Sequence, residues 1–341
     1  MNTQRFDSAF DGKRIFATAI CAAGLLQPAL AQTAPAVLTV EVTNVVGYLE
    51  DTSDLTKFAT LPNATPSVAV RNFAFQEHIG DIVAVNGQPV KGTLVRDVRT
   101  AGVGPSAALG EGIADVAWRG VMADVFEFLS DDGSVIGTFV GHGPAQVSGA
   151  QPGIFAITGG TGAFLGALGQ YVPALIPGSP TVRTASVAED PANRRQNGGG
   201  HLNFVLQVIP LFRPEIVMTV SGPNASAPAV VHSSDFSLVT AANPAKAGEY
   251  LSVIAKGLGP VHGNVAAGQA FPASPLATVV SPVSVQLNGT AADSVAAVGY
   301  PGSTDSYQVN FRVPANAVHG NATLQLSAAW IPASTVSIAI Q

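Results

Sequence analysis

The sequence predicts an all-β protein with a small antiparallel eight-stranded barrel followed by a β-sandwich. Charged residues make up only 11% of the 341 residues, whereas the chain contains 36 Gly and 24 Pro. This composition favours strands joined by turns, because glycine and proline interrupt helices. Short stretches of alternating apolar and polar residues recur at hairpin spacing. The composition then changes after a proline-rich stretch near residue 220, and the length itself favours two domains.

The first 31 residues predict a secretory signal peptide. Lys13 and Arg14 close a polar segment, residues 15–26 are apolar, and small residues precede a cleavage site after Ala31. A membrane anchor is the alternative, disfavoured because an apolar run of about a dozen residues is too short to span a bilayer. A lipid anchor at Cys21 is disfavoured by the bulky Ile20. Cleavage would remove Cys21, the only cysteine, and leave a mature chain starting at Gln32 without disulfides.

The barrel is predicted from about eight strands between residues 32 and 209. Asn86-Gly87 is a hairpin signal, because both residues tolerate the left-handed conformation of a type I′ turn. Closing such a sheet into a barrel removes its exposed edges. The expected strands are residues 37–46, 68–77, 82–85, 93–98, 113–129, 135–140 and 201–209, with two more flanking a glycine-rich turn inside 155–171.

A linker is predicted at residues 210–228, which contain Pro214, Pro223 and Pro228. Residues 229–341 carry few charges and show further strands at 250–256, 283–287, 307–313, 322–328 and 335–340. Their spacing and the turns between them are typical of a β-sandwich.

Residues 133–172 carry the most distinctive motif of the first domain, an apolar strand that runs into a Gly-Gly-Thr-Gly turn. The segment resembles the allene oxide cyclase and dirigent barrel superfamily. The resemblance implies a barrel with an apolar cavity for a hydrophobic small molecule, and isomerase/cyclase-like or dirigent-like steering if the protein is an enzyme. We interpret the turn as a structural hairpin and not an anion site, since no helix with a phosphate-binding lysine follows. The matching residues are Gly159, Gly160, Thr161, Gly162, Phe164, Ala167 and Gly169.

Polar residues on strand-like stretches are the candidates for catalysis inside the barrel. The alternative for each is a solvated outward position. The four singled out are Glu77, Glu127, Arg119 and His142, and a carboxylate whose pKa is raised by an apolar barrel would be the first choice as acid or base. The wider set is Arg71, Glu77, His78, Arg96, Asp97, Asp115, Arg119, Asp124, Glu127 and His142.

Residues 234–341 resemble a C-terminal immunoglobulin-like (IPT/TIG-type) module of bacterial exported proteins. That resemblance implies no chemistry. Tyr307 and Trp330 could line a sugar- or protein-binding surface, with core or edge packing as the alternative. The matching segments are Asn243-Pro244-Ala245, Gly248, Gly257-Leu258-Gly259-Pro260, Val283-Ser284-Val285, Asn288-Gly289 and the run from Tyr307 to Pro314.

Charge and motif content disfavour several classes of function. The net charge of −6 comes without a basic patch, so nucleic acid and anionic membranes are poor partners. The six histidines lack metal-ligand spacing, no cofactor motif occurs, and no later segment is long enough for a transmembrane helix.

Two hypotheses follow. In the first, a secreted bacterial protein binds an apolar small molecule in its barrel and, if it is an enzyme, steers the reaction of that molecule. In the second, a non-catalytic envelope or extracellular protein adheres to a protein or glycan partner. An open apolar pocket with inward carboxylates would favour the first hypothesis. An interior filled by aromatic rings would favour the second; the rings expected there are Phe73, Phe75, Trp118, Phe126 and Phe155.

Overall fold

The structure is a computed structural model that describes residues 34–51, 73–101, 120–144, 153–174, 178, 180–186, 189–222, 225–263 and 265–341. Residues Pro35–Gln341 make up one compact unit. Within the described ranges, no helix has the length and apolar character needed to cross a membrane. The predicted signal peptide lies outside the described residues, as do Arg71, Asp115, Trp118 and Arg119.

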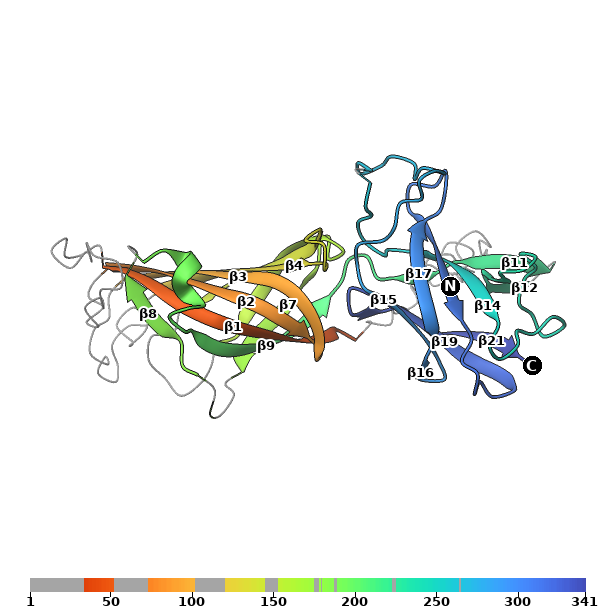
Figure 1. Cartoon of the computed structure of the whole chain (residues 1–341), viewed down its shortest axis with the longest axis horizontal. Coiled ribbons are helices and arrows are strands. Elements are labelled where there is room, and N and C mark those ends of the chain that lie inside the picture. The colour runs from red at the N-terminus through yellow and green to blue at the C-terminus, as the bar shows by residue number, and fades with distance from the viewer. Residues whose placement is uncertain are drawn as a thin grey trace, which may run out of the picture. The chain divides into compact units, whose positions relative to one another are not determined.

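Eight of the first nine strands form a closed antiparallel barrel, which confirms the predicted fold class (Figure 1). These eight pair in the ring order β1-β2-β3-β4-β5-β6-β7-β9, and β9 returns to β1. The remaining strand, β8, pairs in parallel with the second half of β1. The strands are β1 (Ala36–Asp51), β2 (Phe73–Val85), β3 (Gln88–Ala101), β4 (Gly120–Leu129), β5 (Val135–Pro144), β6 (Phe155–Gly162), β7 (Leu168–Ala174), β8 (Arg183–Ser186) and β9 (Gly200–Ile209).

The β2–β3 hairpin turns at Asn86-Gly87, as the sequence predicts. Both residues have positive φ, 52° and 73°, which matches the twist of the flanking strands. The strands themselves are longer than predicted, because β2 continues through Ile79–Asp81, paired throughout with β3 and, on either side of a register shift between Thr43 and Val46, with β1. Hydrogen bonding on both sides extends the strand through a stretch whose sequence pattern is weak.

The Gly-Gly-Thr-Gly motif ends β6 and opens the turn to β7. Gly162 has a φ of 60°, a left-handed conformation that favours glycine. The turn after it directs Phe164 into the barrel, where its ring centroid lies 4.1 Å from that of Phe139. Within the described residues the motif therefore forms part of the β6–β7 hairpin, and the turn places Phe164 in the barrel core.

Two further antiparallel sheets pack across a common apolar core in the C-terminal half (Figure 1). One sheet is built on β14 and β18, the other on β15 and β19. A 3-10 helix, η3 (Pro191–Arg194), precedes β9 in the barrel. The strands are β10 (Glu215–Ile216), β11 (Met218–Gly222), β12 (Ala225–Pro228), β13 (Val230–His232), β14 (Tyr250–Lys256), β15 (Val283–Leu287), β16 (Thr290–Ala291), β17 (Asp293–Gly299), β18 (Ser306–Arg312), β19 (Gly320–Ala328), β20 (Ile331–Pro332) and β21 (Val336–Ile340).

The segment predicted as a linker carries strands of its own. β10, β11 and β12 all lie within residues 210–228. β10 pairs with β14 through Glu215 and Ile216, so this part of the segment belongs to a C-terminal sheet.

Aromatic rings fill much of the barrel interior. Phe126 packs edge-on against both Tyr171 and Phe204, with centroids 5.4 and 5.1 Å apart. Phe128 and Phe139 form another edge-to-face pair at 5.9 Å. All five rings are at most 1% exposed. An eight-stranded barrel is just wide enough for side chains to fill, and large rings accomplish this here.

Candidate functional site

A buried polar network crosses the barrel interior and is made by Arg96, Asp124 and Tyr171. Arg96 donates from Nε and Nη2 to the two carboxylate oxygens of Asp124, at 2.7 and 2.8 Å. The hydroxyl of Tyr171 donates to the same carboxylate. Arg96 is 6% exposed, Asp124 0% and Tyr171 1%. The two charges therefore neutralise each other inside an apolar core, and every oxygen of the carboxylate is bonded.

Strand register places the interior network. His78, Arg96, Asp124 and Gly141 are direct partners across β2, β3, β4 and β5, and Gly47 of β1 begins the same row. Directly paired residues point to the same face of a sheet, so these side chains share the barrel interior. The row thus brings together three ionisable groups that are far apart in the sequence.

Glycines at both ends of this row leave room for rings. A Cβ atom on Gly141 would lie 2.3 Å from Cε1 of Tyr171, and one on Gly47 would lie 2.5 Å from Cδ2 of His78. Both distances are shorter than any real Cβ contact, so a larger residue at either position would displace the ring. The sequence thus places a glycine, which has no side chain, against each of these two rings.

Burial and charge set the proton affinities inside the barrel. Burial raises the pKa of the Tyr171 hydroxyl well above its usual range, and the adjacent Asp124 carboxylate raises it further. Burial alone would lower the pKa of Arg96, but its bonds to Asp124 outweigh that effect and raise it. The network therefore consists of the Arg96–Asp124 ion pair and the neutral Tyr171 phenol, which donates a hydrogen bond to Asp124.

His78 is the remaining ionisable group of the row. Its Nδ1 atom is inaccessible to water and has no hydrogen-bond partner among the described residues. Burial lowers the pKa of the imidazole to about 4, the positive charge of Arg96 lowers it as well, and Asp124 opposes both. His78 is accordingly neutral at physiological pH and carries one unsatisfied ring nitrogen.

The structure places three of the four singled-out residues on the outer face of the barrel. Glu77 pairs with Tyr48 and Asp97, on the face opposite His78. His142 pairs with Ala123 and is exposed, bonded to the Thr158 hydroxyl at 3.2 Å. The two lie in one row three strand spacings apart, about 14 Å.

Glu127, the third, lies further along β4. It pairs with Thr93 and Thr138, also on the outer face. The structure therefore does not bring Glu77, Glu127 and His142 together. The remaining candidate, Arg119, lies outside the described residues.

Sequence reasoning left the interior network unranked, because alternation alone does not separate inward-facing from outward-facing charged residues on these strands. Asp124 lies in phase with Met122 and Phe126, and Arg96 lies in phase with Leu94 and Val98. Glu77 lies equally in phase with Phe75 and Ile79, however, and Glu127 with Val125 and Leu129, yet both glutamates face outward. Phase with apolar neighbours therefore does not single out Arg96 and Asp124, and Tyr171 is brought to them only by the closure of the barrel.

Ion pairs on the outer wall attach η3 to the barrel. Arg194 and Arg195 both bind Asp81, the latter at 2.7 and 2.8 Å, and Asn44 donates to the same carboxylate at 2.9 Å. Burial alone would raise the pKa of Asp81, but these bonds outweigh it and hold the pKa below its usual value. Among the described residues, no three metal-binding side chains converge on one point.

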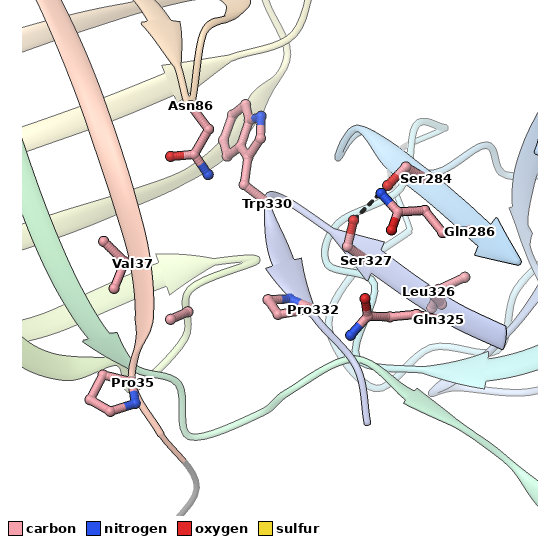
Figure 2. Close-up of a pocket in the computed structure, with 11 residues that line it drawn as sticks. Pro35, Val37, Asn86, Ser284, Gln286, Gln325, Leu326, Ser327, Trp330 and Pro332 are labelled. Atoms are coloured by element: carbon pink, nitrogen blue, oxygen red, sulfur yellow. Dashed lines mark hydrogen bonds between the residues drawn. The ribbon is translucent and has the colours of Figure 1, made fainter. Parts of the chain in front are cut away.

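A polar groove lies along the outer face of β15 and β19 (Figure 2). Val285 and Leu287 face the sandwich core, so Ser284 and Gln286 face outward. On β19 the outward residues are Gln325 and Ser327. Register pairs Ser284 with Ser327 and Gln286 with Gln325, and the two serine hydroxyls are bonded at 2.7 Å.

The wall of this groove comes from the β19–β20 turn and the start of β1. The groove has a volume of about 360 Å³. Its full lining is Pro35, Ala36, Val37, Asn86, Ser284, Gln286, Gln325, Leu326, Ser327, Trp330 and Pro332. None of these residues is charged, so the groove presents amides, hydroxyls and apolar surfaces alone.

Trp330 reaches the groove from an unusual turn. Ala328 pairs with Ile331, which leaves Ala329 and Trp330 as a two-residue turn with φ values of 46° and 63°. Such turns ordinarily use Asn-Gly, because other residues resist positive φ. The conformation costs on the order of 1–3 kcal/mol per residue and persists only where surrounding contacts hold it. One such contact is Phe128, whose ring centroid lies 5.7 Å from that of Trp330.

Comparison with known proteins places the chain in no family. No family description matches the sequence, and no curated protein matches it. Among solved structures, the N-terminal domain of an adhesin from Streptococcus gordonii aligns at 10% identity over 92% of this chain and 93% of that one, with a TM-score of 0.16. A score this low carries no structural argument, so function has to be argued from the residues themselves.

Proposed function

We propose that this protein acts outside the cytoplasm as a non-catalytic attachment protein whose barrel is a rigid scaffold. The observation that carries this proposal is the interior network, where Arg96, Asp124 and Tyr171 bind one another. A general acid or base needs a proton or lone pair free for the substrate, and these groups have theirs engaged. The packed rings around them are those of a filled core.

Export is part of the same proposal. The signal-peptide pattern of residues 1–31 supports it, with Gln32 as the first residue of the mature chain. N-terminal sequencing of the protein recovered from the cell envelope or medium should give Gln32. Recovery of the chain with Met1 intact would contradict export.

Attachment is tested by retention of the labelled mature chain on isolated envelope fractions and extracellular polysaccharide. We expect saturable binding that is lost when the protein is unfolded. The variant Arg96→Met/Asp124→Leu removes the interior charges together, and it should bind as the wild type does once circular dichroism shows that it is folded. Absence of saturable binding to every fraction would overturn the proposal, and so would selective loss of binding in the folded variant.

A second candidate function, binding of an apolar small molecule inside the barrel, is favoured by one observation. The Nδ1 atom of His78 is buried and has no hydrogen-bond partner in the part of the chain that the structure describes, and a buried polar atom of this kind calls for a ligand or a water. The rings of Phe155 and Phe204, which contact the neighbouring Arg96, suit a hydrophobic compound. Native mass spectrometry after exposure to lipid and phenolic extracts should then show a retained compound that the His78→Phe variant loses. Retention of none would remove this candidate.

A further inference from the structure

We infer that the groove along β15 and β19 binds a neutral saccharide. The inference rests on the proposed attachment function and names the partner's chemistry. The groove is lined by three amide side chains and two hydroxyls: Asn86, Gln286, Gln325, Ser284 and Ser327. Amides and hydroxyls both donate and accept hydrogen bonds, whereas carboxylates only accept and lysine or arginine only donates. A ligand covered in hydroxyl groups needs partners that do both.

The absence of charge from the groove lining selects against other ligands. Phosphate, sulfate and carboxylate groups are held by charge-assisted hydrogen bonds, and no lysine, arginine or histidine lines the groove. An acidic peptide or an anionic glycan would lose its hydration there without a compensating ion pair. An uncharged polyhydroxylated ligand keeps its hydrogen bonding and carries no ionic group to desolvate.

Flat apolar surfaces lie among the polar groups. Trp330, Pro35 and Pro332 line the groove beside the amides (Figure 2). A pyranose ring has the same mixture, with C–H bonds on its faces and hydroxyls at its edge. An indole offers a rigid, apolar face together with a polar N–H, so it can cover a sugar face while the amides reach the hydroxyls. The strained turn at Ala329-Trp330 holds this indole at the groove.

The outer face of an ordinary solvated sheet is also polar, but it is not hollowed into a groove. Here the face is hollowed to a volume of about 360 Å³, within the range of small-molecule sites. A second pair of exposed glutamines, Gln170 on β7 and Gln207 on β9, is joined by a hydrogen bond of 2.6 Å but does not line the groove. That second glutamine pair gives a matched control.

The experiment screens the mature chain on an array of neutral, sialylated and sulfated oligosaccharides, followed by calorimetric titration with the best neutral compound. The variant is Gln286→Ala/Gln325→Ala, and the control is Gln170→Ala/Gln207→Ala. We expect binding to neutral glycans, weakened by about tenfold or more in the variant because two hydrogen-bonding groups are lost, and unchanged in the control. Circular dichroism and thermal unfolding confirm that both double variants are folded.

Three results would overturn the inference: no retention on any neutral glycan, binding confined to the acidic glycans, or equal weakening in variant and control. The same variants tested on envelope fractions separate this inference from the attachment function. If the wild type and Gln286→Ala/Gln325→Ala adhere equally, attachment stands and the saccharide groove fails. If the wild type adheres to no fraction, the attachment function itself fails.

Discussion

The barrel and the sandwich are both built from antiparallel strands, yet their cores differ in chemistry. The barrel interior holds seven buried aromatic rings and a buried Arg–Asp ion pair, Arg96–Asp124, whereas the core cluster of the two C-terminal sheets holds three rings among aliphatic side chains. Among the described residues of that half, the buried polar ones are His232, Ser252 and Ser281. Two sheets about 10 Å apart leave a thin layer, which aliphatic side chains largely fill here beside the rings of Phe271, Tyr307 and Phe311. A closed barrel has to be filled across a wider space, and long side chains do so at the cost of bringing polar tips inside.

Because the two cores differ, different kinds of substitution should lower the stability of each half. A buried ion pair is stabilising only while both partners are present, because a single remaining charge is neither paired nor hydrated. An apolar core loses stability in proportion to the volume removed. Polar substitutions should therefore affect the barrel most, and cavity-forming substitutions should affect the sandwich.

The largest effect is expected from Arg96→Met, which leaves Asp124 buried without its partner. The free energy of unfolding should fall by about 3–5 kcal/mol. In Arg96→Met/Asp124→Leu both charges are gone, and most of that loss should be recovered. Urea denaturation of the two variants measures the difference. Equal destabilisation in both variants would show that the pairing of the two charges is not the source of the lost stability.

A cavity in the sandwich should have a somewhat smaller effect. Leu324 is fully buried between the C-terminal sheets. The change Leu324→Ala removes about three carbons from a packed site and should lower the free energy of unfolding by about 3 kcal/mol. The matched surface change Thr323→Ala, at an exposed position on the same strand, should leave stability within about 0.5 kcal/mol. Thermal unfolding compares them, and equal shifts would contradict the apolar core.

The third prediction concerns pH and is confined to the barrel. His78 has a pKa of about 4 when folded, below the usual value near 6.5. Between these values the unfolded chain binds a proton that the folded barrel does not, so stability falls as pH decreases. From pH 7 to pH 5 the loss from this residue should be about 2 kcal/mol. Urea denaturation at both pH values should show the loss in the wild type and a smaller one in His78→Gln.

A direct titration completes this test. The imidazole resonances of His78 should remain those of the neutral ring down to pH 5 in nuclear magnetic resonance spectra. A midpoint near 6.5 would show that the ring is hydrated and unaffected by Arg96, and it would remove the basis of the pH prediction. The exposed His142 serves as the internal comparison.

Local sequence patterns were enough to predict the all-β class and the Asn86-Gly87 hairpin. These features depend on local rules: composition, alternation with period two, and residues that tolerate positive φ. His78, Arg96 and Asp124 of the interior network also stand among the ten polar candidates on strand-like stretches. The ranking favoured Glu77, Glu127 and His142, which lie on the outer face of the barrel.

Only the tertiary structure decided which face of each strand lies inside, because a shift of one residue exchanges the two faces of a strand. Glu77 and His78 are neighbours in the chain and lie on opposite sides of the barrel wall. Closure of the barrel then brought Tyr171 to Asp124, 47 residues away, and pairing of β15 with β19 placed Gln286 opposite Gln325. Such contacts join segments that are distant in the sequence, so no local pattern could have predicted the network or the groove.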